Sequence, residues 1–384
     1  MGSLSRKTVA WATGAALAVG GCTAGIVIAA QGAGGSGSVS PGPGATAAAR
    51  AAVVKPAPPP PLRVVSISPA SGAGDANGAG NITVTYNQPL PATAPLPTLS
   101  PSIAGSWQRT GDAVVFTPAT GFPAGTHVTV TAAGAGDSST IRSESSSFKT
   151  GKYSTLRLQE ILAQLGYLPL TWTPAAGAAG VNTASAAAQL SAAYAPPAGT
   201  FQWQPGYPAQ LHSFWAQGQA NTLDRGAIMG FEADHGLPVD GTAGSAVWKA
   251  LLTAAAADKR NTHGYSYAIT SERLPETLTI WHDGRKVFSA PANTGISVAP
   301  TATGTFPVYE KLTFQIMQGT NPDGSHYADP VSWVSYFNGG DAVHYFPRGS
   351  YGWPQSLGCV ELTYNAAKDA YPYLPYGTLV TVTA

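Results

Sequence analysis

Hydrophobic residues change their spacing along this chain, and each spacing predicts a different kind of structure. Between 62 and 150, β-prone runs such as Ile82–Tyr86 and Val128–Thr131 alternate with Gly, Pro, Asn and Asp clusters, which favours a small β-sandwich. From 151 to 257 the apolar residues recur at helical spacing, and from 264 to 384 strand patterns return. We therefore expect a multidomain protein in which a β-sandwich, a small α-helical domain and a mostly-β domain follow one another.

The first 61 residues do not have the pattern of a folded domain. Two basic residues, Arg6 and Lys7, precede an apolar run within residues 1–30, which is the order of an export signal or membrane anchor. Residues 31–61 are rich in Gly, Ala, Ser and Pro, which is typical of an extended linker. Cleavage, lipidation at Cys22 and retention of the helix are all open, and we favour retention. The expected location is the cell envelope, outside the cytoplasmic membrane, with the protein tethered to that membrane or secreted to the wall.

Composition limits the partners of this protein. Its 20 Lys and Arg residues nearly balance 19 Asp and Glu residues, so no basic surplus favours nucleic acid. The only cysteines are Cys22 and Cys359, which excludes a disulfide scaffold. No pair of histidines has metal-ligand spacing, and no second cysteine lies near Cys359, so we expect neither a metal nor a cofactor.

The two regions before the last one resemble known wall-associated modules. Segments such as Ile67–Pro69 and Phe116–Pro118 resemble bacterial immunoglobulin-like domains, which implies a stalk at 62–150. An apolar helical stripe that ends at Gly166, followed later by Gly236–Gly241, resembles the small three-helix peptidoglycan-binding domain at 151–257. That family usually lacks the insertion at 171–221, whose aromatic residues we expect to be buried rather than to stack on sugars.

The last region contains several ordered motifs. Asp283 and Gly284 separate two strand patterns, which predicts a tight hairpin. The run Pro300–Phe306 is followed by a strand that ends at His344, and Cys359 stands 15 residues after that histidine. In this order and spacing, residues 264–384 resemble the L,D-transpeptidase catalytic domain.

The residues themselves favour cysteine chemistry at this place. A thiol becomes a nucleophile when a nearby base takes its proton, so Cys359 is the candidate nucleophile and His344 the candidate base. A lone cysteine is more often a small buried hydrophobe, but the ordered motifs favour the catalytic interpretation. Gly358 permits close approach of substrate, and its backbone N–H is a candidate oxyanion donor together with that of Cys359. Ser356 belongs to the same motif, and the resemblance implies that the carbonyl of Tyr345 orients the base.

Several further residues are candidates for binding the substrate. They are Tyr327, Trp333, Phe337, Asn338, Gly339, Trp353 and Glu361. Two residues depart from the family's motif, because Leu357 stands where His is usual and Glu361 where Arg or Asn is usual. A bare carboxylate beside the thiol would raise the thiol pKa. We therefore expect Glu361 to be neutralised by Arg348 or Lys368, or aimed at an incoming amine. A solvated carboxylate turned away from the site is the alternative.

The resemblance implies an acyl-transfer reaction on peptidoglycan. Cys359 would attack the diamino acid at the third position of a stem tetrapeptide, release D-alanine and pass the acyl group to the amine of a second stem. Stem peptides and glycan are then the expected partners, and carbapenem-type β-lactams the expected inhibitors. Water as acceptor would make the protein an L,D-carboxypeptidase, and a protein amine would make it an enzyme that anchors proteins to the wall. The alternative from another class is a non-catalytic surface protein that binds peptidoglycan.

Overall fold

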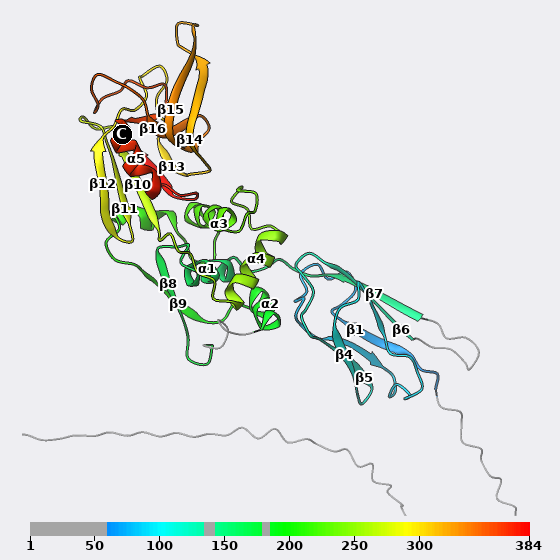
Figure 1. Cartoon of the computed structure of the whole chain (residues 1–384). Coiled ribbons are helices and arrows are strands. Elements are labelled where there is room, and N and C mark those ends of the chain that lie inside the picture. The colour runs from blue at the N-terminus through cyan, green and yellow to red at the C-terminus, as the bar shows by residue number, and fades with distance from the viewer. Residues whose placement is uncertain (1–59, 134–142, 179–184) are drawn as a thin grey trace, which may run out of the picture. The chain divides into compact units, whose positions relative to one another are not determined.

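The computed structural model describes residues 60–133, 143–178 and 185–384 (Figure 1). The anchor expected at 1–30, with Cys22, and nearly all of the expected linker at 31–61 lie outside these residues. Within the described ranges, none of the helices has the length and apolar character needed to cross a membrane.

Two antiparallel sheets form the first described region. One sheet has the order β1-β2-β5-β4 and the other β3-β6-β7. Side chains of β2 alternate between buried and half-buried positions, as expected for a strand with one face on a core. The β-rich pattern predicted here is therefore present, while the immunoglobulin-like assignment stays a prediction. The strands are β1 Val64–Ser68, β2 Ile82–Tyr86, β3 Thr98–Ser100, β4 Gly105–Thr110, β5 Ala113–Pro118, β6 His127–Ala133 and β7 Ser143–Lys149.

Helices dominate the second region. Helix α1 ends where Gly166 adopts a φ of 80°, a left-handed conformation that glycine adopts without a steric penalty. Helix α3 begins after Asn221, whose side chain accepts a hydrogen bond from the backbone N–H of Asp224. This is an N-cap that satisfies a free helical donor. The elements are α1 Thr155–Gln164, β8 Leu170–Pro174, α2 Ala186–Tyr194, β9 Gly199–Trp203, the 3₁₀ helix η2 Ala209–Phe214, α3 Thr222–Asp234 and α4 Ser245–Ala256.

The predicted insertion contributes structure of its own to this region. Strands β8 and β9 pair as a two-stranded antiparallel sheet. Trp203 stacks on His212 with ring centroids 4.0 Å apart. Tyr207 is buried, while Phe201 and Trp215 are partly buried against the helical core. The expectation that these aromatic residues pack into the core is confirmed.

Two sheets and a short helix form the last region (Figure 1). One sheet has the order β12-β11-β10-β18-β13 and the other β14-β15-β16-β17. Apolar side chains of both sheets and of α5 share one core. The elements are β10 Ser266–Ser271, β11 Thr277–His282, β12 Arg285–Pro291, β13 Gly304–Pro307, β14 Glu310–Thr320, β15 His326–Asn338, β16 Asp341–Tyr345, β17 Val360–Leu362, α5 Tyr364–Ala370, the 3₁₀ helix η3 Tyr371–Tyr373 and β18 Leu379–Thr383.

The predicted hairpin joins β11 and β12 with Asp283 and Gly284 at its turn. Both turn residues have positive φ angles, 46° and 73°. Two consecutive positive φ angles match the right-handed twist of the flanking strands. This prediction is confirmed.

Candidate active site

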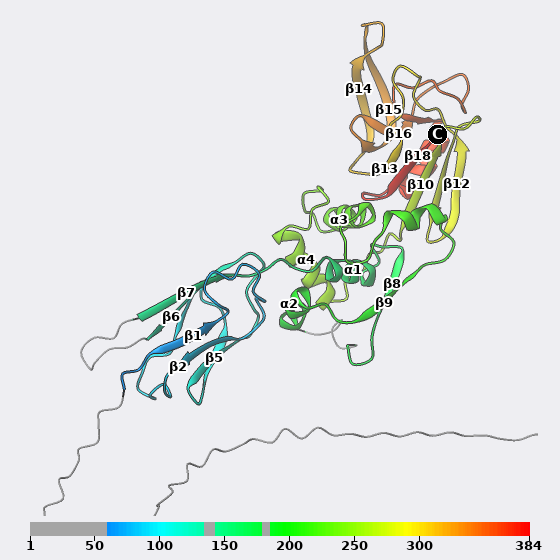
Figure 2. The same cartoon turned by 180° about the vertical axis from the view of Figure 1, so that it is seen from behind.

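Strands β16 and β17 bring the candidate base and nucleophile together. They pair in parallel, with His344 opposite Glu361 and Val343 opposite Val360. Cys359 immediately precedes β17. Because residues opposite one another in a ladder point to the same face, His344 and Glu361 share a face, and side-chain alternation places Cys359 on it too. Figure 2 shows β14, β15 and β16 side by side in the sheet that carries this site.

The Cys359 thiol is partly enclosed by the protein. Its Sγ lies 3.6 Å from the carbonyl oxygen of Gly340, and among the contacts of the described residues none is a hydrogen bond to His344. Catalytic hydrogen bonds are often long before substrate binds. Burial, together with the smaller effects of the Asp341 and Glu361 carboxylates, raises the thiol pKa to about 12, although the hydrogen bond with the Ala342 backbone lowers it. The thiol is therefore protonated at neutral pH.

His344 has the geometry of a general base. Its Nδ1 lies 3.0 Å from the carbonyl oxygen of Tyr345, which is the contact that the family resemblance predicts. Donation from Nδ1 to that carbonyl leaves Nε2 as the acceptor for a proton. Burial lowers the pKa of His344 below its ordinary value of 6.5, although the Tyr345 carbonyl and Glu361 raise it. The imidazole is therefore neutral at pH 7, the form that accepts a proton.

Glycine and serine shape the turn that precedes the nucleophile. Gly358 has a φ of 118°, and a Cβ atom there would meet Asp341 Oδ1 at 2.5 Å. Its N–H donates to Ser356 Oγ (3.2 Å), and the Ser356 hydroxyl donates to the carbonyl of Cys359. The prediction that the Gly358 N–H is free to hold an oxyanion is therefore wrong, because this donor already has a partner. Ser356 holds the turn closed, and its hydrogen bonds among the described residues are to backbone groups of Gly358 and Cys359.

The turn between β15 and β16 places a carboxylate that the sequence did not single out. Asp341 Oδ2 accepts hydrogen bonds from the N–H of Ala302 (3.2 Å) and from Nδ2 of Asn338 (3.4 Å). Gly339 has a positive φ of 52°. Asn338 and Gly339 thus shape the turn that carries Asp341. In the sequence, only the position of Asp341 three residues before His344 could have indicated that it lies near the site.

Arg348 neutralises Glu361, as one of the sequence alternatives predicted. Arg348 Nε lies 2.8 Å from Glu361 Oε2, and Nη2 lies 2.8 Å from Oε1. This two-point geometry is the strong form of an Arg–carboxylate pair. The Glu361 side chain is 5% exposed, so the alternative of a solvated carboxylate is wrong. Lys368 lies on α5 and is exposed.

The aromatic candidates separate into core and surface residues. Phe337 is 2% exposed and belongs to the core between the two sheets, so its prediction as a substrate contact is wrong. Trp333 is partly buried against the same core, with its ring centroid 5.6 Å from that of Tyr371. Tyr327 lies close enough to the thiol for a Cys359 thiolate to raise its pKa, although burial raises it more. Trp353 is half exposed, with Nε1 bonded to Ser350.

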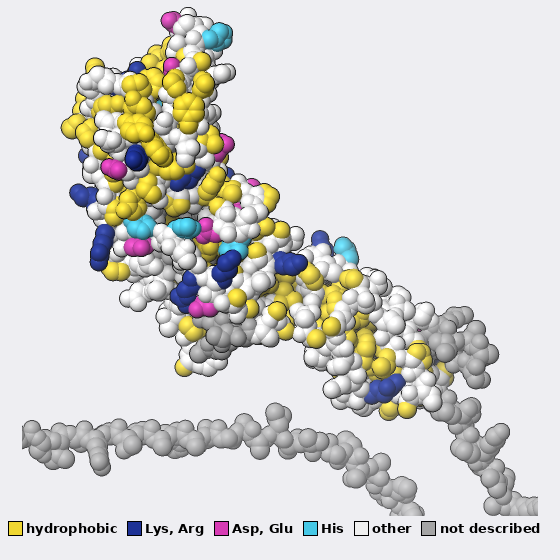
Figure 3. All heavy atoms as spheres, viewed as in Figure 1, with side chains coloured by type: hydrophobic (Ala, Val, Ile, Leu, Met, Phe, Trp, Pro, Cys, Tyr) yellow, Lys and Arg dark blue, Asp and Glu magenta, His cyan; other side chains and the backbone are white. Residues whose placement is uncertain are grey.

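The long hairpin of β14 and β15 presents apolar side chains to solvent. Phe314 and Ile316 on β14 are 58% and 52% exposed, and β14 pairs with β15 over nearly its full length. Figure 3 shows hydrophobic side chains gathered over the catalytic region in this view. Phe314 and Ile316 therefore lie on the strand next to β15, which in turn pairs with the strand of His344.

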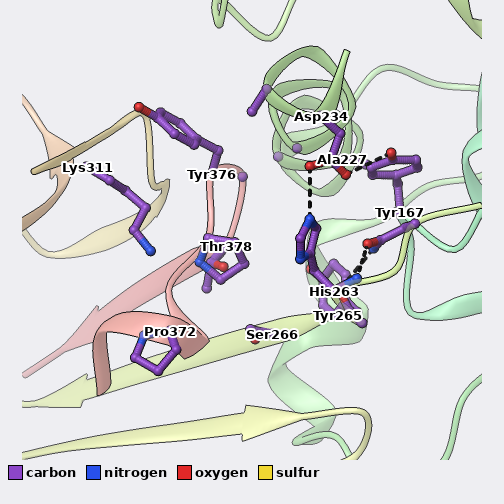
Figure 4. Close-up of a pocket in the computed structure, with 17 residues that line it drawn as sticks. Tyr167, Ala227, Asp234, His263, Tyr265, Ser266, Lys311, Pro372, Tyr376 and Thr378 are labelled. Atoms are coloured by element: carbon purple, nitrogen blue, oxygen red, sulfur yellow. Dashed lines mark hydrogen bonds and ion pairs between the residues drawn. The ribbon is translucent and has the colours of Figure 1, made fainter. Parts of the chain in front are cut away.

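A hollow of about 370 Å³, apart from the candidate active site, is lined by residues of α3, β14 and the segment before β18 (Figure 4). Asp234 accepts a hydrogen bond from the hydroxyl of Tyr167 (2.9 Å) and lies 3.3 Å from His263. Burial lowers the pKa of Lys311, which also lines the hollow, to about 8. Neither the candidate nucleophile nor the candidate base lines it. Among the described residues, no group of three or more His, Cys, Asp or Glu side chains is arranged to hold a metal ion.

Comparison with known proteins identifies the last region. Residues 267–382 match the YkuD family model, the L,D-transpeptidase catalytic domain. No curated protein matches the chain.

Solved L,D-transpeptidases are similar to the chain at low identity. An enzyme from Mycobacterium smegmatis is 16% identical, with 85% of this chain and 100% of that one covered and a TM-score of 0.29. L,D-transpeptidase 3 from Mycobacterium tuberculosis, in complex with a faropenem-derived adduct, is 16% identical over 84% of this chain and 98% of that one, with a TM-score of 0.29. The catalytic domain of the Enterococcus faecium enzyme is 23% identical over 32% of this chain and 100% of that one, also with a TM-score of 0.29.

Proposed function

We propose, on the premise that residues 267–382 are an L,D-transpeptidase catalytic domain, that this protein cross-links peptidoglycan stem peptides through a thioester on Cys359. The observation that carries the proposal is the pairing of β16 with β17. With side-chain alternation along β17, this pairing supports an arrangement in which a neutral, backbone-oriented imidazole shares a face with the one thiol of the catalytic region. A nucleophile and an oriented base are the minimum for acyl transfer by a cysteine enzyme.

The first step forms the acyl-enzyme. His344 Nε2 takes the thiol proton while Sγ attacks the carbonyl carbon of the third-position diamino acid of a donor tetrapeptide. The tetrahedral intermediate collapses with cleavage of the peptide bond to D-alanine, whose amine leaves with the proton that the imidazolium returns. Because burial raises the pKa of the thiol, the proposal has the proton move to His344 as Sγ attacks.

The second step transfers the acyl group to another stem. The side-chain amine of a second diamino acid attacks the thioester carbonyl, loses a proton to His344 and expels the thiol, which is reprotonated. The products are one cross-linked dimer and one free D-alanine. The buried imidazole is neutral at the start of both steps.

We extend the proposal to the part of the chain before the catalytic domain. A groove of about 1180 Å³, lined in part by Tyr153, Leu158 and Trp248, borders the helical region. Aromatic and aliphatic walls of this kind suit contact with sugar rings or stem peptides. The helical region would hold the catalytic domain on the wall, and the N-terminal segment would tether the protein to the cytoplasmic membrane.

The experiment that tests the proposed function is incubation of the full chain with disaccharide-tetrapeptide, followed by mass spectrometry of the products. We expect a cross-linked dimer and free D-alanine. Tripeptide without dimer would replace the transpeptidase with an L,D-carboxypeptidase. Unchanged substrate, with a folded protein, would support a non-catalytic wall-binding protein.

A carbapenem gives an independent test of the same thiol. The family resemblance implies that the β-lactam carbonyl acylates Cys359 and opens the ring, so the protein should gain the full mass of the drug. Intact-protein mass spectrometry should show this gain in the wild type and not in Cys359→Ala. Absence of an adduct on the wild type after prolonged incubation would count against the proposed function.

A further inference from the structure

The pair formed by Arg348 and Glu361 does more than remove a charge. The segment 346–358 connects the strand of the base to the turn of the nucleophile. Arg348 lies near its start, and its Nη2 donates to the carbonyl of Gln355 near its end (3.0 Å) as well as to Glu361 on β17. One guanidinium therefore joins both ends of the segment to the strand that follows the nucleophile.

Glu361, the other member of this pair, is anchored in the sheet through its backbone. The backbone of Glu361 exchanges two hydrogen bonds with Asn293, of 3.0 and 2.9 Å, and its strand pairs with that of His344. The Arg348 guanidinium also lies over the ring of Phe346, 4.6 Å from its centroid. Glu361 is thus held through its backbone by Asn293 and β16 and through its carboxylate by Arg348, so the carboxylate cannot turn away without loss of its two bonds to Arg348.

We propose that Arg348 is a positioning residue for the nucleophile: through Glu361 and Gln355 it fixes the turn that carries Cys359, and it offsets the carboxylate that shares a face with Cys359 and His344. This inference rests on the proposed function and adds a residue to it. The motif of L,D-transpeptidases has a basic or amide residue where this chain has Glu361. Here the positive charge comes instead from the segment before the nucleophile.

The other charged and titratable groups around the thiol do not replace Arg348. Asp341 adds a second negative charge from β16, and Tyr327 and Tyr336 face the thiol from β15. His344 is neutral in the resting site. Among these groups of the described site, Arg348 carries the positive charge, so its removal leaves the Glu361 carboxylate without its partner.

Removal of the positive charge at Arg348 and removal of the negative charge at Glu361 should therefore shift the pKa of the Cys359 thiol in opposite directions. Arg348→Met leaves Glu361 bare and raises the thiol pKa, while Glu361→Gln leaves Arg348 unpaired and lowers it. At a fixed pH well below the thiol pKa, each unit of pKa change alters the thiolate fraction about tenfold. The double variant removes both charges and should return close to the wild type.

The test measures alkylation of Cys359 by iodoacetamide at a fixed pH near 8.5, with peptide-level mass spectrometry to separate it from Cys22. We expect a roughly tenfold slower reaction in Arg348→Met and a several-fold faster one in Glu361→Gln, with the double variant between them. Lys368→Met, which removes an exposed lysine of the same domain, is the matched control and should react at the wild-type rate.

Two further measurements make the result decisive. Cross-linking of disaccharide-tetrapeptide should fall in Arg348→Met and recover in part in the double variant, and melting curves confirm that each protein is folded. Shifts of the same sign in both single variants, or no shift in either, would overturn the inference. If Arg348→Met does not fold, the rate of Glu361→Gln decides alone, and an unchanged or slower rate overturns the inference. Absence of cross-linking by the wild type would contradict the proposed function instead, because alkylation does not depend on it.

Discussion

Two Arg–Glu pairs, one in the helical region and one in the catalytic region, have the same chemistry but differ in how far their side chains are exposed. Arg157 and Glu160 lie on α1, 2.8 Å apart, with side chains 0% and 1% exposed. Arg348 and Glu361 are also 2.8 Å apart, but Arg348 is 29% exposed and Glu361 5%. The first pair is enclosed on all sides, whereas the second lies at the edge of the candidate active site.

The pKa of the arginine is shifted in opposite directions in the two pairs. Burial lowers the pKa of Arg157 and raises that of Glu160, so both ions are disfavoured relative to water. Arg157 also donates to Gln189 (2.8 Å), as expected for a buried ion that needs every available partner. The hydrogen bond to Glu361, by contrast, raises the pKa of Arg348 despite its partial burial. We therefore expect loss of one partner of the enclosed pair to affect stability and loss of one partner of the open pair to affect the reactivity of Cys359.

The largest effect should come from removal of the base. His344→Ala should slow acylation of Cys359 about a thousandfold, because general-base catalysis by a positioned imidazole contributes on the order of a hundredfold to ten-thousandfold. The free energy of unfolding should change far less than the rate. Stopped-flow acylation and urea unfolding of the same preparation measure both quantities, and a near-normal rate would remove His344 from the mechanism.

The next prediction concerns the enclosed pair, whose disruption should change stability rather than the reactivity of Cys359. Arg157→Met leaves Glu160 buried without its partner and should lower the free energy of unfolding by about 3–5 kcal/mol. The alkylation rate of Cys359 in folded protein should stay unchanged. Arg157→Met combined with Glu160→Leu should recover most of the stability. A loss under about 1 kcal/mol in the single variant would show that the enclosed pair does not hold the helical region together.

The smallest effect concerns pH. His344 has its pKa lowered below 6.5, so the imidazole is neutral from that value upward, and acylation should lose about tenfold per unit only below the folded pKa. Because the thiol pKa is about 12, ionisation of the thiol should not raise the acylation rate between about pH 7 and 9. Acylation by a carbapenem should therefore be level between about pH 7 and 9. A rate that rises steadily across this interval would indicate a thiolate formed before attack.

Local sequence patterns predicted much of the fold because local chemistry decides those elements. The hairpin at Asp283–Gly284 needs two positive φ angles, which these residue types tolerate, and the helix before Gly166 ends where a glycine permits it. Motif order likewise singled out Cys359 and His344, and strand pairing puts both on one face of the sheet. The sequence also suggested a Glu361 carboxylate beside the thiol, and the register of β17 puts it on the same face.

The remaining errors concern contacts that span the fold. Phe337 resembles a groove residue in sequence, but the register of β15 turns it into the core between the sheets. The N–H of Gly358 seemed free because only the closed turn brings Ser356 Oγ to it. Sequence distance could not choose between Arg348 and Lys368 as the partner of Glu361, and the position of α5 decided it.

The most direct test of the central claim is detection of the acyl-enzyme itself. The full chain is mixed with disaccharide-tetrapeptide, quenched in acid and digested, and the peptide that contains Cys359 is analysed by mass spectrometry. We predict a thioester whose acyl group is the donor stem without its terminal D-alanine, together with an equal amount of free D-alanine. The adduct should be absent in Cys359→Ala. Release of D-alanine by the wild type with no acyl group on Cys359, or equal release by Cys359→Ala, would contradict the account.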